Sequence, residues 1–471
     1  MNNWELVIGI EIHLELNTKT KMFSSQPNLY TKNANIYVSH IDLAYPGSLP
    51  LVNKEAIIKG IKLAKALNMT IDRNIRFDRK NYFYPDLTKG YQITQQFNPI
   101  GKEGFTKIKV DNKWFQVPIE RIHLEEDTAK SLHEKDLTYL NYNRAGIPLI
   151  EIVSKPAMHS AKEAVAYVES IKQIALALNI SDAKMNEGSL RVDLNISVRK
   201  KGTQDLNTRV EIKNLNSTSN IEKAIEYEFK YQVDCYENNR FFAQETKRFD
   251  ESKNITVSMR SKADSIDYKY FPDPNIPYIE LPEEVIESIK IEELPYDKEK
   301  RYELNGLNNV QISQLINNVH YANFLDNLKT SNFKKTANIF FSEIVSFLNS
   351  EQLELKGLEL DNEQTSQLIE WIIKGDINKN NLKLILKKHL EQPSLKLKNL
   401  ITQNNWFIEK IEFSLDKIIQ EILSENANLK EEFKINPNRA SKFMMGQAMK
   451  KTMGKANPIE LNKKIKELYE A

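Results

Sequence analysis

The 471-residue chain has a single cysteine, Cys235, so it can form neither an internal disulfide nor a zinc site built from several cysteines. This scarcity suits a reducing compartment, and we expect the protein in the cytoplasm. Only 14 glycines occur, and none forms the Gly-x-x-x-x-Gly-Lys-Ser/Thr or Gly-x-Gly-x-x-Gly pattern that cradles phosphates. A Gly-x-Ser-x-Gly elbow is also missing. Nothing therefore predicts a P-loop nucleotide site or acyl-enzyme chemistry on this chain.

An excess of one charge is lacking too, because 66 lysines and arginines stand against 64 acidic residues, a net charge of +2. Any nucleic-acid surface must therefore be local. No apolar run approaches the roughly 18 to 20 residues that cross a bilayer, and the first residues show no signal or transit pattern. We expect a protein of several domains that binds neither membrane nor DNA.

Residues 10–16 alternate strictly between apolar and polar side chains, the pattern of a β-strand with one buried face. Glu11, His13 and Glu15 then share the other face. Two carboxylates and an imidazole in a row can hold a cation or move protons. A solvated strand face is the simpler interpretation of this segment taken alone.

Carboxylates recur in other stretches that have strand character. Glu151 stands alone among four β-prone apolar residues in 149–153, where a carboxylate must be neutralised, paired or bound to metal. The stretches 190–198 and 208–214 repeat the alternation of 10–16. The candidate anionic groups of these segments are Glu125, Glu126, Asp127, Asp193 and Glu211. Oxygen-rich sites of this kind favour Mg²⁺ held together with substrate phosphates.

Basic and aromatic residues in or beside these stretches favour a phosphorylated ligand. Residues 79–86, Arg-Lys-Asn-Tyr-Phe-Tyr-Pro-Asp, break the periodicity and predict a loop. This loop is either an aromatic-packed turn or a platform for a nucleotide or an RNA end. The candidate binding residues are Lys80, Tyr82, Tyr84, Arg191, Arg260 and Lys262. Phosphoryl transfer is the best chemical match.

Helical spacing and capping patterns predict covering helices at 53–67 and 160–178, and a third from Ser219 to about Tyr231 with Glu222 completing its capping box. From about residue 298 the sequence turns helical, with a break near 393–405 and a lysine-rich segment from about Phe413. We expect an α+β domain over 1–295, an all-α domain over 296–411 and a small all-α tail over 412–471.

A set of motifs spans nearly the whole chain in order. They are VIGIEIH from 7, DLAYPG from 42, FDRKNYFYPD from 77, HLEED from 123, NRAGIPLIEIV from 143, EGSLRVD from 187, EIKNLN from 211, YFPDP from 270, and GQAMK with GKANP near the C-terminus. Together they closely resemble the B-subunit family of the aspartyl/glutamyl-tRNA(Asn/Gln) amidotransferases.

The resemblance implies a cradle-shaped catalytic domain related to the glutamine synthetase fold, then the helical domain and tail. It implies an ATP-dependent carbon–nitrogen ligase that uses ATP and Mg²⁺ to activate Glu mischarged on glutamine tRNA, or Asp on asparagine tRNA. The implied partners are the mischarged tRNA and, in a heterotrimer, the amidase (A) and small (C) subunits. By motif match the catalytic and metal residues are Glu11, His13, Glu125, Glu151 and Asp193. Weaker candidates are Glu126, Asp127, Glu187, Glu211 and Asn214, of which Glu211 and Asn214 join the nucleotide-binding set.

The lysine-rich tail is expected to hold tRNA phosphates through Lys442, Lys450, Lys451 and Lys455, although a solubilising helical face is the simpler alternative. Two other functions also fit part of the chain. A non-catalytic tRNA-binding scaffold leaves the carboxylates without a purpose, and a metal-dependent phosphohydrolase leaves the basic tail without one. Cys235 standing alone excludes the cysteine-bound zinc of some family members.

Overall fold

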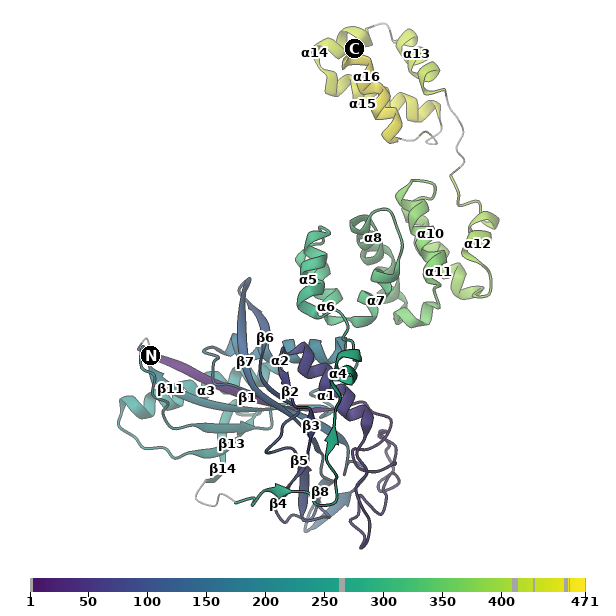
Figure 1. Cartoon of the computed structure of the whole chain (residues 1–471). Coiled ribbons are helices and arrows are strands. Elements are labelled where there is room, and N and C mark those ends of the chain that lie inside the picture. Colours follow the sequence, from purple (N-terminus) through teal and green to yellow (C-terminus); the bar gives the residue numbers. More distant parts are fainter. Residues whose placement is uncertain are drawn as a thin grey trace. The chain divides into compact units, whose positions relative to one another are not determined.

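The computed structural model describes residues 3–261, 267–408, 414–426, 428–452, 456 and 458–470. The chain divides into two compact units, Met1–Lys298 and Glu299–Ala471, drawn in Figure 1. The first unit is rich in sheet and the second is helical, so the fold is the mixed arrangement of strands and helices that the sequence predicts at this level.

A nine-stranded sheet organises the first unit, in the order β14-β13-β12-β11-β1-β10-β7-β6-β2. Neighbouring strands are antiparallel except β12 and β13, which are parallel. The strands are β1 (Trp4–Glu15), β2 (Thr70–Ile71), β6 (Gly101–Val110), β7 (Lys113–Glu126), β10 (Pro148–Ser154), β11 (Leu190–Lys200), β12 (Val210–Lys213), β13 (Glu245–Asp250) and β14 (Ile255–Ser261).

The predicted alternation of β1 is confirmed, because Ile8, Ile10, Ile12 and Leu14 are at most 1% exposed. They join one hydrophobic cluster with side chains of α1 (Lys54–Ala66), α2 (Ala161–Ala177) and α3 (Thr218–Glu237). Asn53 and Ser160 cap α1 and α2 as expected, each accepting hydrogen bonds from backbone N–H groups of the first turn. The polar side chains of β1 face away from this core.

The start of α3 differs from the prediction. The cap is Ser217, whose hydroxyl accepts a hydrogen bond from the backbone N–H of Asn220, and the helix runs on to Glu237 rather than Tyr231. Two serines within three residues offer competing caps. Both serines are suitable caps by residue type, and the hydrogen bond from the Asn220 N–H identifies Ser217 as the one that is used.

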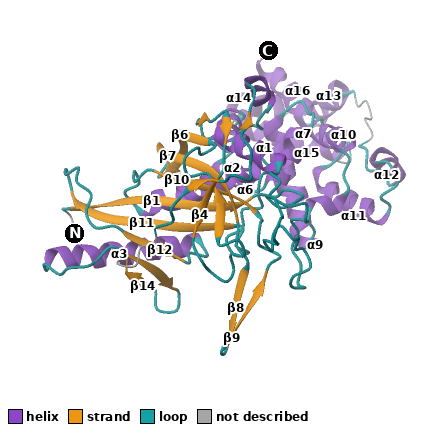
Figure 2. Cartoon of the chain, turned by 60° about the horizontal axis from the view of Figure 1, so that its bottom comes forward, coloured by secondary structure: helices purple, strands orange, loops and turns teal. Residues whose placement is uncertain are grey.

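Three smaller sheets lie in the described part of the first unit. They pair β4 (Asp78–Asn81) with β5 (Tyr91–Thr94) and β15 (Phe271–Pro272), β3 (Asn74–Ile75) with β16 (Ile279–Glu280), and β8 (Lys130–Glu134) with β9 (Leu137–Asn141). Figure 2 shows β8 and β9 as a hairpin that extends from the unit. The loop predicted at 79–86 is wrong for its first part, since residues 79–81 belong to β4. Pairing with strands on both sides supplies the ladder that local periodicity does not reveal.

The helical part contains two separate hydrophobic clusters, one formed within residues 302–401 and one within 419–465. The predicted break near 393–405 is partly wrong, because α12 lies inside it and buries Leu397, Leu400 and Ile401. No helix among the described residues has the length and apolar character to cross a membrane. The α-helices that follow β16 in the described chain are α4 (Glu283–Ser288), which belongs to the first unit, and then α5 (Pro295–Leu304), α6 (Asn309–Asn317), α7 (Val319–Asn327), α8 (Phe333–Ile339), α9 (Ser346–Glu351), α10 (Asn362–Ile373), α11 (Leu382–Glu391), α12 (Leu397–Gln403), α13 (Leu415–Glu425), α14 (Leu429–Ile435), α15 (Pro437–Lys451) and α16 (Pro458–Glu470).

Candidate functional site

The strand register gathers the predicted carboxylates on the polar face of the sheet. Glu11 lies opposite Asp193 of β11, and His13 lies opposite Glu151 of β10. Glu151 in turn lies opposite His123 of β7. Since side chains that are cross-strand partners share one face of a sheet, residues far apart in the sequence form one polar row.

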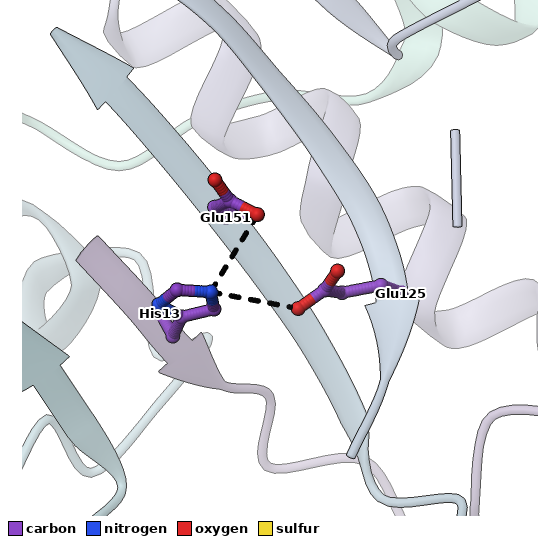
Figure 3. Close-up of side chains that lie close together, drawn as sticks. All are labelled: His13, Glu125 and Glu151. Carbon is purple, nitrogen blue, oxygen red and sulfur yellow. Dashed lines mark ion pairs between the residues drawn. The ribbon is translucent and has the colours of Figure 1, made fainter. Parts of the chain in front are cut away.

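The first cluster on this face consists of His13, Glu125 and Glu151 (Figure 3). His13 Nε2 lies 3.5 Å from Glu151 Oε2 and 3.7 Å from Glu125 Oε1. One potential ligand atom from each residue lies within 4.8 Å of the others. Burial by itself would raise the pKa of Glu151, but His123 and His13 lower it by a larger amount. The net pKa is well below the ordinary value, so the carboxyl group stays ionised.

His123 is a member of this site that the sequence analysis missed. Its Nε2 lies 3.1 Å from Glu151 Oε2 and 3.7 Å from Glu125 Oε2. Burial lowers the pKa of His123, but Glu151 and Glu125 together raise it to about 9. The His-x-Glu spacing of residues 123 and 125 mirrors the Glu-x-His spacing of β1. This repeated alternation is the sequence signal that could have identified His123 as a site residue.

The second cluster consists of Glu11, Asp193 and Glu211, again with one potential ligand atom from each within 4.8 Å of the others. Asn195 Nδ2 donates a hydrogen bond to Glu11 Oε1 at 2.9 Å. Burial raises the pKa of Glu11, and the neighbouring carboxylates raise it further. This cluster therefore concentrates negative charge that a cation would stabilise.

Lys213 contacts the second cluster and was not predicted. Its Nζ donates to Asp193 Oδ2 at 2.7 Å and lies 3.0 Å from Glu211 Oε1. Burial lowers the pKa of Lys213, but the two carboxylates raise it above the ordinary lysine value. The ammonium group supplies one of the positive charges that the three acidic side chains require.

The donor set of the two clusters fits a hard divalent cation. Five of the six groups are carboxylates, and only His13 offers nitrogen. Mg²⁺ prefers oxygen ligands and keeps several waters, so a triad of carboxylates leaves room for phosphate oxygens. No cysteine belongs to either cluster.

Lys80 and Tyr82 lie beside the first cluster. Burial by itself would lower the pKa of Lys80. Glu125 and other neighbouring anionic groups raise it by a larger amount, so the net pKa lies above the ordinary lysine value and the ammonium group lies in the electric field of the cluster. Lys80 Nζ also lies 4.8 Å from the ring centroid of Tyr268, and Tyr82 packs edge to face on the same ring. Tyr84 is 56% exposed.

Arg191 is engaged by Asp127, whose Oδ2 accepts a hydrogen bond from it at 2.8 Å. Arg144 donates to the same carboxylate at 2.5 and 2.9 Å. Burial by itself would raise the pKa of Asp127, but the two guanidinium groups lower it by a larger amount, so the net pKa lies below the ordinary value. Burial and the Asp127 charge raise the pKa of Glu15 to about 7. Asp127 is thus the centre of a charge network at the end of β1.

Three further candidates, Glu126, Glu187 and Asn214, belong to neither cluster. Glu126 pairs with Lys89 at 2.6 Å and accepts a hydrogen bond from the Ile93 backbone N–H, away from both triads. Glu187 pairs with Lys184 on the surface. Asn214 is exposed directly after β12, with φ of 63°. The side chain of Arg260 and all of Lys262 lie outside the described residues.

Among the tail lysines, Lys442 and Lys450 are exposed on α15. Lys451 instead pairs with Glu421 and Glu425 of α13, at 3.3 and 2.6 Å. Lys455 lies outside the described residues.

Comparison with known proteins defines the class of this chain. Residues 6–287 match the family model described as GatB/GatE catalytic domain, and residues 323–468 match the GatB domain. The chain is 48% identical to the B subunit of the aspartyl/glutamyl-tRNA(Asn/Gln) amidotransferase of Mycoplasmopsis agalactiae, over 98% of each chain. It is 40% identical to the corresponding protein of Bacillus licheniformis, over 99% of each chain. The chain belongs to this B-subunit family.

Proposed function

We propose that the polar face of the nine-stranded sheet is the ATP-dependent activation centre of a tRNA-dependent amidotransferase. As a member of the family, the chain is the B subunit of such an enzyme, a ligase that takes its amide nitrogen from glutamine. The observation that supports the site is the pair of triads, His13/Glu125/Glu151 and Glu11/Asp193/Glu211, side by side on adjacent strands.

The reaction assigned to this site has two steps. The side-chain carboxylate of Glu or Asp on the tRNA attacks the γ-phosphorus of ATP, so that ADP leaves and an acyl phosphate forms. Ammonia released by the partner glutaminase then attacks the acyl carbon, phosphate leaves, and the amide remains. Bound Mg²⁺ would neutralise the phosphate oxygens during the first step.

The residues of the chain orient and neutralise the groups that react. The two triads would hold the divalent cations, and His123 donates to Glu151 and so fixes its orientation. The ammonium group of Lys80, beside Glu125, is placed to neutralise phosphoryl charge. Tyr82, packed on Tyr268, offers an aromatic surface near the same cluster.

The finer organisation belongs to the same proposal. The catalytic domain is a cradle related to the glutamine synthetase fold over residues 1–295, followed by a helical domain over 296–411 and a tRNA-contacting tail over 412–471. The three hydrophobic clusters, which fall one in each of these ranges, support this division. The proposed partners are the mischarged tRNA, together with the amidase (A) and small (C) subunits of the same complex.

The test measures γ-phosphate release from ATP by the assembled complex, with and without mischarged tRNA. We expect release that depends on the tRNA. We expect Glu11→Gln and His13→Ala to lower it at least about 100-fold, while glutamine hydrolysis persists. Lys162→Met, which breaks an exposed pair with Asp111, is the control.

Equal release without tRNA would instead indicate a phosphohydrolase. Full activity of both site variants would show that the assigned residues are wrong and would favour a scaffold.

A further inference from the structure

The contacts of Lys213 go beyond what the activation site requires. Its Nζ lies within 3.0 Å of oxygens from two of the three carboxylates of the second cluster. An octahedral Mg²⁺ binds oxygens at about 2.0 to 2.1 Å, so these same carboxylates are the ones that it would need. The ammonium group and the divalent cation therefore compete for one pair of carboxylates.

The second cluster brings like charges close together. Ligand atoms of Glu11, Asp193 and Glu211 lie within 4.8 Å of one another, and Lys213 contacts the last two of these carboxylates. Asp193 and Glu211 are largely shielded from water, with side chains 14% and 21% exposed. Partial burial strengthens both the repulsion among the carboxylates and their attraction for any cation.

Lys213 also lies at a partly exposed position, where its side chain can move away from the carboxylates toward solvent. It is the last residue of the four-residue strand β12, and exposed Asn214 follows it. The Lys213 side chain is 35% exposed. Glu211 has a second anchor, because Thr246 Oγ1 donates a hydrogen bond to its Oε2 at 2.7 Å. Departure of the lysine would thus leave Glu211 in position.

We propose that Lys213 is an exchangeable counter-cation that neutralises Asp193 and Glu211 until a divalent cation displaces it. This inference rests on the proposed function, because it takes the second cluster to be a cation site. The displaced ammonium group becomes available to a phosphate oxygen of the nucleotide. Lys213 therefore competes with the cation for these carboxylates, and once displaced its ammonium group changes partner from the carboxylates to the substrate.

The decisive experiment titrates the full chain with Mn²⁺ and follows free Mn²⁺ by electron paramagnetic resonance. Removing a competing charge should tighten binding, so we expect Lys213→Met to bind Mn²⁺ at least about tenfold more tightly at the second cluster. Lys213→Arg keeps the charge and should stay near the wild-type value. Lys162→Met is the control for net charge. A purely structural lysine would give the opposite sign, since its loss would disorder the carboxylates and weaken binding.

A double-variant cycle locates the effect. Glu211→Gln removes one contact of Lys213, so the gain from Lys213→Met should shrink in that background. Unchanged or weaker binding by folded Lys213→Met would overturn the proposal. If neither Glu11→Gln nor Glu125→Gln alters Mn²⁺ binding, the cation sites themselves are wrong and this inference falls with them. If these two variants weaken binding and Lys213→Met does not tighten it, only the role of Lys213 is wrong.

A measurement on the unaltered protein keeps the proposal testable should Lys213→Met fail to fold. Mass spectrometry after brief amine labelling reports the reactivity of each lysine. Mn²⁺ should increase the labelling of Lys213 several-fold by freeing its amine, and should leave Lys162 unchanged. Labelling of Lys213 that stays constant at saturating Mn²⁺ would contradict displacement.

Discussion

Glu15 occupies the end of the polar row, where its carboxyl group meets the charge network of Asp127. Because its pKa is raised to about 7, the folded protein holds this proton up to about neutral pH, whereas the unfolded chain releases it near the ordinary value of 4.5. The stabilisation from this proton is therefore complete below pH 4.5 and is lost as the pH rises through about 7.

The replacement Glu15→Gln should remove this pH dependence. Since the amide carries no titrating charge, we expect the free energy of unfolding to stay flat where that of the wild type declines. Well above neutral pH the variant should be more stable by roughly 1 to 3 kcal/mol. Urea denaturation over a pH series measures this difference, with Glu222→Gln on an exposed position of α3 as control. The same decline in wild type and Glu15→Gln would assign the titration to another group.

At the scale of single residues, the sequence predicts well which face of a strand a side chain occupies. It predicts poorly which side chains contact one another across strands. Alternation within β1 placed Glu11 and His13 on a polar face, and alternation within β11 did the same for Asp193. The roles of His123 and Lys213 depend on which residues lie opposite them across the sheet. That register is set by long-range packing, so it does not follow from the pattern of a single strand.

The helix α3 is fixed to the edge of the sheet by a buried ion pair. Glu228 is fully buried and lies 3.2 Å from Nζ of Lys247 in β13. Its carboxylate also accepts a hydrogen bond from Thr256 of β14 at 2.7 Å and one from Gln232 at 3.0 Å. One side chain therefore connects a helix to two strands.

Truncating this carboxylate should be costly because it leaves a buried ammonium group without its main partner. We expect Glu228→Ala to lower the free energy of unfolding by about 3 to 5 kcal/mol. The double variant Glu228→Met with Lys247→Met removes both charges and should recover most of that loss. Urea denaturation compares the two, and an equally destabilised double variant would show that packing rather than charge accounts for the effect.

Elements with strong local signals were predicted, and those that depend on distant partners were not. The helices at 53–67 and 160–178 carry both a cap and an apolar face. The strand β4 has the sequence Asp-Arg-Lys-Asn, which carries no apolar alternation. It forms because β5 and β15 pair with it. The same reason explains α12, whose three apolar residues pack into the second hydrophobic cluster.

On the scale of the whole molecule, the tail has a hydrophobic core of its own. Ile419, Ile422, Met444, Leu461 and Ile465 are each at most 3% exposed and join α13, α15 and α16. The cluster has its own members, distinct from those within residues 302–401. A segment that folds around its own core can be removed with little effect on chemistry carried by the first unit.

Removing residues 413–471 should therefore weaken tRNA binding and spare ATP binding and glutamine hydrolysis by the partner amidase. Each phosphate that the protein no longer neutralises should flatten the slope of log affinity against log salt by roughly 0.7 to 0.9. The point variants Lys442→Gln and Lys450→Gln should each show that change, because their ammonium groups are exposed on α15. Lys451→Gln is the matched control, since Lys451 is paired with Glu421 and Glu425.

Filter-binding titrations at several salt concentrations give the slopes. Full affinity and an unaltered slope after truncation would leave the lysines as a solvated helical surface, whereas an effect confined to Lys451→Gln would point to the folding of the tail and not to its contact with RNA.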